Sequence, residues 1–182
     1  MAAFTIRVAA PSDAEVLAEL AWRTFHEAFV EDFAVAYPAE DLAEFRAEAY
    51  SAAAFLLRIE HPGSRAWMAE TDDGEPLGYA TVGPCTLPHP DARPTDGELK
   101  QLYVTRASYG LGLGRALLDT ALGWLERDAP RTLWIGVWSG NHRAQAIYAA
   151  RGFTEVGEYQ FPVGRWRDQE FILRREAGRS GA

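Results

Sequence analysis

The sequence contains very little cysteine, and it has no long hydrophobic run. Cys85 is the single cysteine among 182 residues, so the chain can form neither an internal disulfide nor a cysteine-rich metal site. No window approaches the roughly 18 uncharged apolar residues of a membrane helix, and the first residues lack a basic segment followed by an apolar run. We therefore predict a cytoplasmic protein with no membrane insertion.

Basic residues are also scarce. The chain has 18 Lys and Arg against 26 Asp and Glu, which gives a formal net charge of −8. Such a surface repels the phosphates of nucleic acids and the anionic face of a membrane, so neither is expected as a partner. The four histidines lack the spacing of metal ligands, and no metal is expected.

The hydrophobic content, 48% of the residues, is enough for the core of one compact domain. We expect this domain to cover residues 1–175 and residues 176–182 to form a disordered tail. Hydrophobic periodicity places helices between strands, which predicts a mixed sheet in an α/β arrangement. Strands are expected at 4–8, 65–71, 77–82, 98–104, 132–138, 154–161 and 171–174, and helices over about 18 residues after Asp13, at 39–50 and 52–60, from the glycine-rich segment to 128, and at 141–151.

Three closely spaced glycines, Gly110, Gly112 and Gly114, stand between an expected strand and an expected helix. Glycines at this position let a phosphate approach the free backbone N–H groups of the helix N-terminus, where the helix dipole favours an anion. Arg115 and Ala116 follow instead of the Lys and Ser or Thr of a Walker A loop, and the glycine spacing does not match a dinucleotide fingerprint. The segment predicts a different phosphate-bearing ligand, unless it is only a tight turn.

A second segment, SGNHRAQAIYAARGF from Ser139 to Phe153, follows the apolar run LWIGVW. With the glycine segment about 30 residues earlier and ELKQLYV before it, this chain resembles the GNAT superfamily of acetyl-CoA-dependent N-acetyltransferases over about residues 98–157. Within the superfamily it most resembles the polyamine (spermidine and spermine) acetyltransferase branch. The resemblance implies a single-domain α/β fold with a mixed, mostly antiparallel sheet of six or seven strands, splayed at the cofactor site and flanked by helices on both faces.

The resemblance also implies how acetyl-CoA is held. The strand backbone at 102–104 pairs with the pantetheine arm, the loop amides hold the pyrophosphate, Asn141 contacts the arm and Tyr148 stands at the thioester sulfur. Where the family usually has Gln or Arg, this chain has Tyr109, so only amide contacts are expected at that position. The expected cofactor residues are Leu102, Tyr103, Val104, Tyr109, Gly110, Leu111, Gly112, Leu113, Gly114, Arg115, Asn141 and Tyr148.

The spacing of Asn141 and Tyr148 is consistent with one site. Seven residues at 100° each fall about 20° short of two full turns, so both side chains lie on one helix face. The alternative is that Asn141 only caps the helix and Tyr148 is a core aromatic.

Catalysis requires a base, because an alkylamine of pKa about 10.4 is neutral in only about one molecule in two thousand at pH 7. Glu98, six residues before Val104, stands at the offset of the base in some family members. The alternatives are a water network, or that Glu98 is a solvated carboxylate near Lys100. The resemblance makes Tyr148 the general acid for the leaving thiolate.

Acidic residues are concentrated in the segment that forms one wall of the acceptor cleft in the resembling fold. Seven acids and one base lie between residues 27 and 48. An acidic, aromatic wall attracts cations, so the expected acceptor is a polyamine or another cationic primary amine. The alternative is that the aromatic residues are core and the acids form a solvated helix face. The residues expected to bind the acceptor are Trp22, Phe25, Glu27, Glu31 and Tyr37.

Two other functions remain open at this point. One is a CoA-binding sensor that has lost transfer activity, and the other is a protein N-acetyltransferase whose acidic face docks a basic protein. A homodimer is expected only by analogy with the family. Cys85 is either a loop nucleophile or inert.

Overall fold

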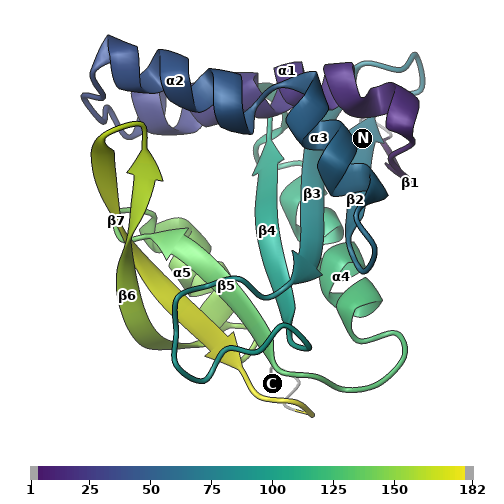
Figure 1. The fold of residues 1–182 in the computed structure, drawn as a ribbon. Helices are drawn as coiled ribbons and strands as arrows, with labels where there is room; N and C mark the ends of the chain where they lie inside the picture. Colours follow the sequence, from purple (N-terminus) through teal and green to yellow (C-terminus); the bar gives the residue numbers. More distant parts are fainter. Residues whose placement is uncertain (1–3, 179–182) are drawn as a thin grey trace.

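The computed structural model describes residues 4–178, and its seven strands form one mixed sheet (Figure 1). The strand order is β1-β2-β3-β4-β5-β7-β6, and every neighbouring pair is antiparallel except β4 and β5. The predicted mixed, mostly antiparallel sheet is therefore confirmed. The strands are β1 (Thr5–Val8), β2 (Arg65–Glu70), β3 (Pro76–Pro84), β4 (Gly97–Val104), β5 (Leu133–Trp138), β6 (Thr154–Val163) and β7 (Trp166–Arg175).

The helices cover both faces of this sheet. Ser51 caps one of them, because its hydroxyl oxygen accepts a hydrogen bond from the Ala54 amide at 3.2 Å. No helix within residues 4–178 is long and apolar enough to cross a bilayer. The α-helices are α1 (Ala14–Phe25), α2 (Ala39–Ala49), α3 (Ala52–Glu60), α4 (Leu113–Leu125) and α5 (His142–Ala149); η1 (Pro11–Asp13) and η3 (Arg106–Ser108) are 3₁₀-helices, and η2 (His26–Asp32) is a π-helix.

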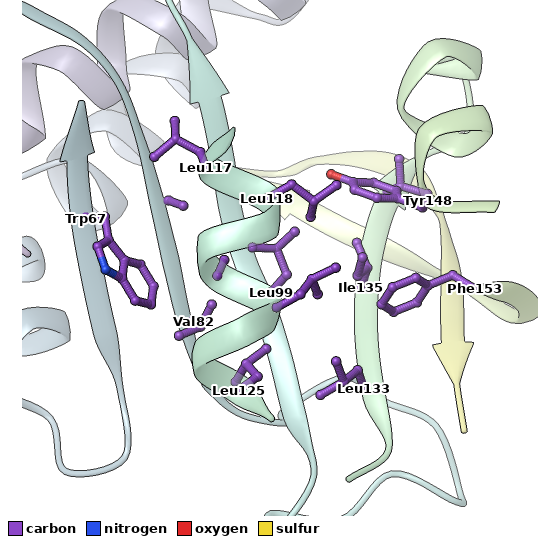
Figure 2. Packing of buried hydrophobic residues seen from close by; sticks show 14 of the residues in the cluster. Trp67, Val82, Leu99, Leu117, Leu118, Leu125, Leu133, Ile135, Tyr148 and Phe153 are labelled. Atoms are coloured by element: carbon purple, nitrogen blue, oxygen red, sulfur yellow. The ribbon is translucent and has the colours of Figure 1, made fainter. Parts of the chain in front are cut away.

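Two large hydrophobic cores hold the helices to the sheet, and a smaller cluster contains Cys85, Trp134 and Ile172. On one face, Leu117, Leu118 and Leu125 of α4 pack with Leu99 of β4 and Ile135 of β5 (Figure 2). On the other face, the side chains of α1, α2 and α3 form a second core against β2 and β3. Its fully buried members include Leu17, Phe55 and Tyr79.

The parallel strands β4 and β5 pair over three positions only. The last of these pairs is Leu99 with Ile135, although β4 continues to Val104 and β5 to Trp138. Beyond this pair the two strands diverge (Figure 1). Backbone N–H and C=O groups on the facing edges therefore have no strand partner, and such groups need another hydrogen-bonding partner. The expected splay of the sheet is present.

Strand β7 is longer than the sequence pattern predicts. It begins at Trp166 instead of Phe171, and it forms a hairpin with β6 through a two-residue turn at Gly164 and Arg165. Gly164 has φ 59°, and an added Cβ would lie 2.7 Å from Cα of Asp41 on α2. Polar residues in the first half of β7 conceal its alternation. The expected tail at 176–182 lies largely outside the described residues, which end at 178.

Candidate active site

A cavity of about 790 Å³ lies at the diverging ends of β4 and β5 and reaches the N-terminal ends of α4 and α5. Of the twelve residues expected to hold the cofactor, all but Leu111 line it. The Leu111 side chain is 47% exposed to solvent. The two sequence motifs are therefore brought to one cavity by the fold.

The glycine segment has the backbone geometry of an anion-binding loop. Gly110 and Gly112 both have φ 80°, and an added Cβ at either position would meet no atom within 4 Å. Glycine is therefore favoured there by the backbone conformation and not by crowding. Gly112 is the N-cap of α4, so the amides of the first turn have no carbonyl one turn earlier and are free for a ligand.

Asn141 and Tyr148 occupy the same cavity from α5. The Asn141 side-chain oxygen accepts a hydrogen bond from the Ala144 amide at 3.0 Å, so this residue is also a helix cap. Tyr148 is buried, and burial raises the pKa of its phenol to about 12. Its hydroxyl is directed toward Leu118 (Figure 2). The phenol therefore keeps its proton at neutral pH and remains a donor.

Several basic residues around this cavity were not predicted. Arg143, His142 and Arg151 line it together with Arg115. The Arg143 guanidinium stands over the ring of Tyr109, 5.7 Å from its centroid. In the sequence Arg143 is an ordinary polar residue in the first turn of a short helix, so only the fold shows that it lines this cavity.

A second cavity, of about 680 Å³, lies on the side of the sheet that α1, α2 and α3 cover. It is lined by aromatic side chains together with the side chains of Arg58, Glu98, Asp168 and Glu170. The two cavities meet where the sheet splays. The residues that line both are Phe29, Lys100, Gln101, Tyr103, Gly136 and Glu170.

Glu170 is the carboxylate at this junction. Its Oε2 accepts a hydrogen bond from the Tyr159 hydroxyl at 2.6 Å. Burial raises the pKa of Glu170 to about 7. Gly136 leaves room for the pair, because a Cβ there would lie 2.8 Å from the Tyr159 hydroxyl oxygen and 3.0 Å from Oε2 of Glu170. Sequence reasoning missed Glu170, which lies in the first half of β7, ahead of the segment predicted as a strand.

Glu98, the base expected from the sequence, is held tightly by its neighbours. Its Oε2 accepts hydrogen bonds from the amide of Thr86 at 2.7 Å and from Lys100 Nζ at 2.5 Å. The residue is 6% exposed, and it lines the second cavity but not the first. The structure therefore places this carboxylate at the second cavity, bound to a cation, and not among the residues that line both cavities.

The expected acceptor wall is largely engaged elsewhere. Of its five residues only Phe25 lines the second cavity, and none lines the first. The Tyr37 hydroxyl donates to Asp168 at 2.5 Å. Trp22 stacks on Phe25, with ring centroids 5.7 Å apart.

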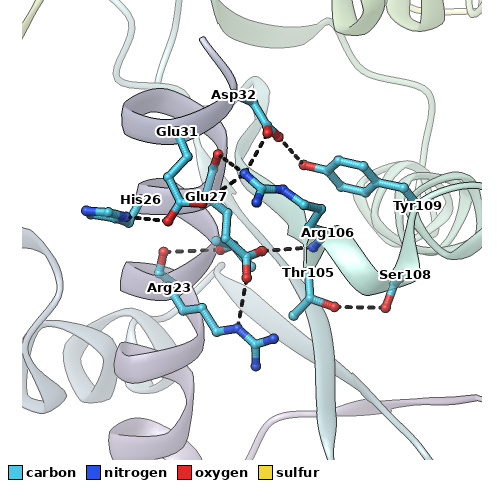
Figure 3. Close-up of polar contacts among 11 residues, drawn as sticks. Arg23, His26, Glu27, Glu31, Asp32, Thr105, Arg106, Ser108 and Tyr109 are labelled. Carbon is cyan, nitrogen blue, oxygen red and sulfur yellow. Dashed lines mark hydrogen bonds and ion pairs between the residues drawn. The ribbon is translucent and has the colours of Figure 1, made fainter. Parts of the chain in front are cut away.

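The acids of η2 are engaged by Arg106 and Arg23, and Glu27 forms its ion pair with Arg23 at 3.0 Å (Figure 3). The Arg106 guanidinium forms ion pairs with Glu31 at 3.0 Å and with Asp32 at 2.6 Å. The backbone amide of Arg106 donates a hydrogen bond to Glu27 at 2.8 Å. Asp32 also accepts a hydrogen bond from the Tyr109 hydroxyl at 3.4 Å. These carboxylates hold η2 against the segment that precedes the glycine loop, so the expectation that they attract a cationic substrate is not supported by their geometry.

Cys85 is buried, and its chain neighbours Pro84 and Thr86 line the second cavity. Burial raises the pKa of its thiol to about 11. Because the thiolate is the nucleophilic form, the burial of this thiol favours the inert alternative over a nucleophile.

The comparisons with known proteins agree with this geometry. Residues 22–153 match the model of the acetyltransferase (GNAT) family. An uncharacterized N-acetyltransferase of Mycobacterium tuberculosis is 32% identical over 165 residues, which cover 91% of this chain and 98% of that protein. One from Lactobacillus delbrueckii subsp. lactis is 28% identical over 149 residues, or 82% of this chain and 86% of that protein.

The fold is also found among solved structures. The PaiA N-acetyltransferase of Thermoplasma acidophilum, in complex with coenzyme A, has a TM-score of 0.69 at 18% identity and covers 96% of this chain and 99% of its own. The paired motifs, the splayed sheet and the family match lead to one conclusion: this chain belongs to the GNAT family of acetyltransferases, enzymes that use acetyl-CoA.

Proposed function

We propose that the protein transfers the acetyl group of acetyl-CoA to a primary amine that enters from the second cavity. The observation that carries this proposal is the meeting of the two cavities at the gap between β4 and β5. The first cavity fits the cofactor, because it combines a free strand edge with helix N-terminal amides and with Arg115 and Arg143. From here on the first is called the cofactor cavity and the second the acceptor cavity.

Acetyl-CoA supplies an activated acyl group as a thioester. We assign its pantetheine arm to the unpaired β4 edge at 102–104 and its pyrophosphate to the first amides of α4. Asn141 keeps its side-chain NH₂ group for the arm, because its oxygen is used in the helix cap. Arg115 and Arg143 neutralise phosphate charge.

Glu170 is assigned as the base and Tyr148 as the acid. An amine arriving as ammonium gives its extra proton to Glu170, which passes it to solvent. The nitrogen–carbon bond then forms as the carbon–sulfur bond breaks. The amine loses one more proton through Glu170, while the Tyr148 hydroxyl gives the released sulfur a proton and regains one from solvent. Glu98 is assigned to hold Lys100 and the loop that begins at Thr86.

The direct test is thiol release from acetyl-CoA across a panel of amines, with the acetylated product identified by mass spectrometry. We expect thiol release in equal amounts with an N-acetyl product for at least one small amine. Coenzyme A binding without turnover on any amine would favour the sensor instead. Turnover only on a basic protein would favour the protein-modifying alternative.

The glycine loop provides a test that does not depend on the acceptor. Alanine at Gly112 disfavours φ 80°, a conformation that costs about 1–2 kcal/mol for a residue with a Cβ. The loop relaxes and moves the amides away from the phosphates, so we expect about tenfold weaker coenzyme A binding by calorimetry. Gly123→Ala is the matched control, because it adds the same methyl group within α4, where no atom lies within 4 Å. Equal dissociation constants for the two variants would contradict the assignment.

A further inference from the structure

Arg58 of α3 is a cation of the acceptor cavity without a counter-ion. Its Nη1 atom is buried and has no hydrogen-bond partner, and no carboxylate within residues 4–178 forms an ion pair with it. The guanidinium carbon stands over the ring of Phe55, 4.6 Å from the centroid. Burial lowers the pKa of Arg58. One nitrogen of the guanidinium is therefore desolvated, and only the contact with the Phe55 ring stands in for the counter-ion that buried charges ordinarily have.

The other charged groups of this cavity are already engaged. Lys100 is bound to Glu98, and Asp168 accepts hydrogen bonds from Tyr37 and from the Trp166 ring nitrogen at 2.9 Å. Glu170 stands at the junction with the cofactor cavity. Arg58 is thus the charged group left for a ligand on the α3 wall.

We propose that Arg58 binds an anionic group of the acceptor, so that the substrate is a small amine carrying a carboxylate or a similar anion. This inference rests on the proposed function, because it places the amine of the same molecule at Glu170. The flat guanidinium matches a carboxylate or a phosphonate with two parallel hydrogen bonds. Tyr50, His61, Ser64 and Gln101 line the same cavity and supply further polar groups.

The same geometry opposes a polyamine. A molecule with several ammonium groups has no anion to offer Arg58, and in this cavity it would bring a second cation close to a desolvated one. The aromatic walls around Phe45 and Phe161 favour an apolar stem between the two charged ends of the substrate. Spermidine is therefore expected to be a poor acceptor.

The test compares ω-amino carboxylic acids of increasing length with their carboxamides, with the diamines of equal length, and with ω-aminoalkylphosphonates. We expect kcat/KM for the best acid to exceed that of its amide by about 10- to 100-fold, as for a charge-assisted hydrogen bond. In Arg58→Met this ratio falls to near one while the amide is still acetylated, and in Arg58→Lys part of the preference returns. Comparison of the ω-aminoalkylphosphonates with the ω-amino carboxylic acids shows whether the site prefers a phosphonate or a carboxylate.

Arg127→Met is the matched control, because this arginine lines neither cavity. Arg58→Met removes a cation that has no counter-ion. The midpoint temperature of its thermal unfolding is therefore expected to equal or exceed that of the wild type. Two results would overturn the inference while the transferase activity stands. One is a ratio of kcat/KM for the acid to that for its amide near one in the wild type, and the other is a ratio that Arg58→Met leaves unchanged. Absence of thiol release with every amine would instead contradict the proposed function.

Discussion

Glu170→Gln is expected to lower kcat/KM at pH 7 by about 100-fold or more. A positioned base contributes typically about 10² to 10⁴ in rate, and the pKa of Glu170 is suited to that role because burial raises it to about 7. A base works best when its pKa is near the working pH, where the ionised form is available and still accepts a proton. Glutamine keeps the shape and the hydrogen-bonding oxygen but cannot accept the proton.

The pH profile distinguishes Glu170 from Glu98. Wild-type kcat/KM is expected to rise with pH through about 7 as Glu170 ionises. Glu170→Gln loses this limb and recovers part of the rate at higher pH, where more of the amine is neutral. Tyr159→Phe moves the limb upward, because the Tyr159 hydrogen bond lowers the pKa of Glu170. If the rise of kcat/KM near pH 7 persists in Glu170→Gln and disappears in Glu98→Gln, Glu98 and not Glu170 is the base.

The stability of the fold reports on the same carboxyl group without any substrate. Its pKa is raised in the folded state, so the folded protein binds more protons than the unfolded chain between the ordinary glutamate pKa of about 4.3 and about 7. The contribution of Glu170 to stability is therefore present at low pH and lost as the pH rises through this window. The midpoint temperature of thermal unfolding is expected to fall more between pH 5 and pH 8 for the wild type than for Glu170→Gln.

The second large effect is expected for Tyr148→Phe, with a loss in kcat of at least tenfold. The phenol remains protonated because its pKa is raised to about 12, and it lines the same cavity as Asn141. Phenylalanine keeps the edge-on ring contact with Phe153 and removes only the proton donor. Rapid-quench measurement of acetyl transfer isolates the step that the donor assists.

Coenzyme A binding is the control for this substitution. A donor to the leaving sulfur affects the rate and leaves the affinity for the cofactor nearly unchanged. A fall in kcat below tenfold would remove the Tyr148 hydroxyl from the proton path. A parallel loss of coenzyme A affinity would instead indicate a binding role.

Local patterns and the family resemblance were enough to predict most of the residues that line the first cavity. The glycines between a strand and a helix, and the seven-residue spacing of Asn141 and Tyr148, depend on contacts within one or two elements. The fold class was predicted from the alternation of helices and strands and from the family resemblance, and the structure confirms that fold class. The π-helix at 26–32 was not predicted, because a segment of seven residues is too short for its hydrophobic pattern to differ from that of an α-helix.

The acceptor side depends on contacts between distant segments, which local patterns do not contain. Glu27 and Glu31 form an acidic face in the sequence, but Arg106 of η3 takes up both. Glu170 reaches the junction only because the β6–β7 hairpin extends through Gly164, and Arg58 is one of many helix arginines until α3 packs on the sheet. Charge composition therefore indicated a cationic acceptor, whereas the proposal built on Arg58 requires an acceptor that also carries an anion.

The short contact between β4 and β5 also makes the cofactor part of the architecture. Strands β1 to β4 and strands β5 to β7 are joined across the sheet by three residue pairs only. A molecule that fills the gap ties these two halves together and adds its binding free energy to that of folding, about 2.7 kcal/mol at one hundred times its dissociation constant. The supply of acetyl-CoA in the cell would then govern how much of this enzyme persists as well as how fast it works.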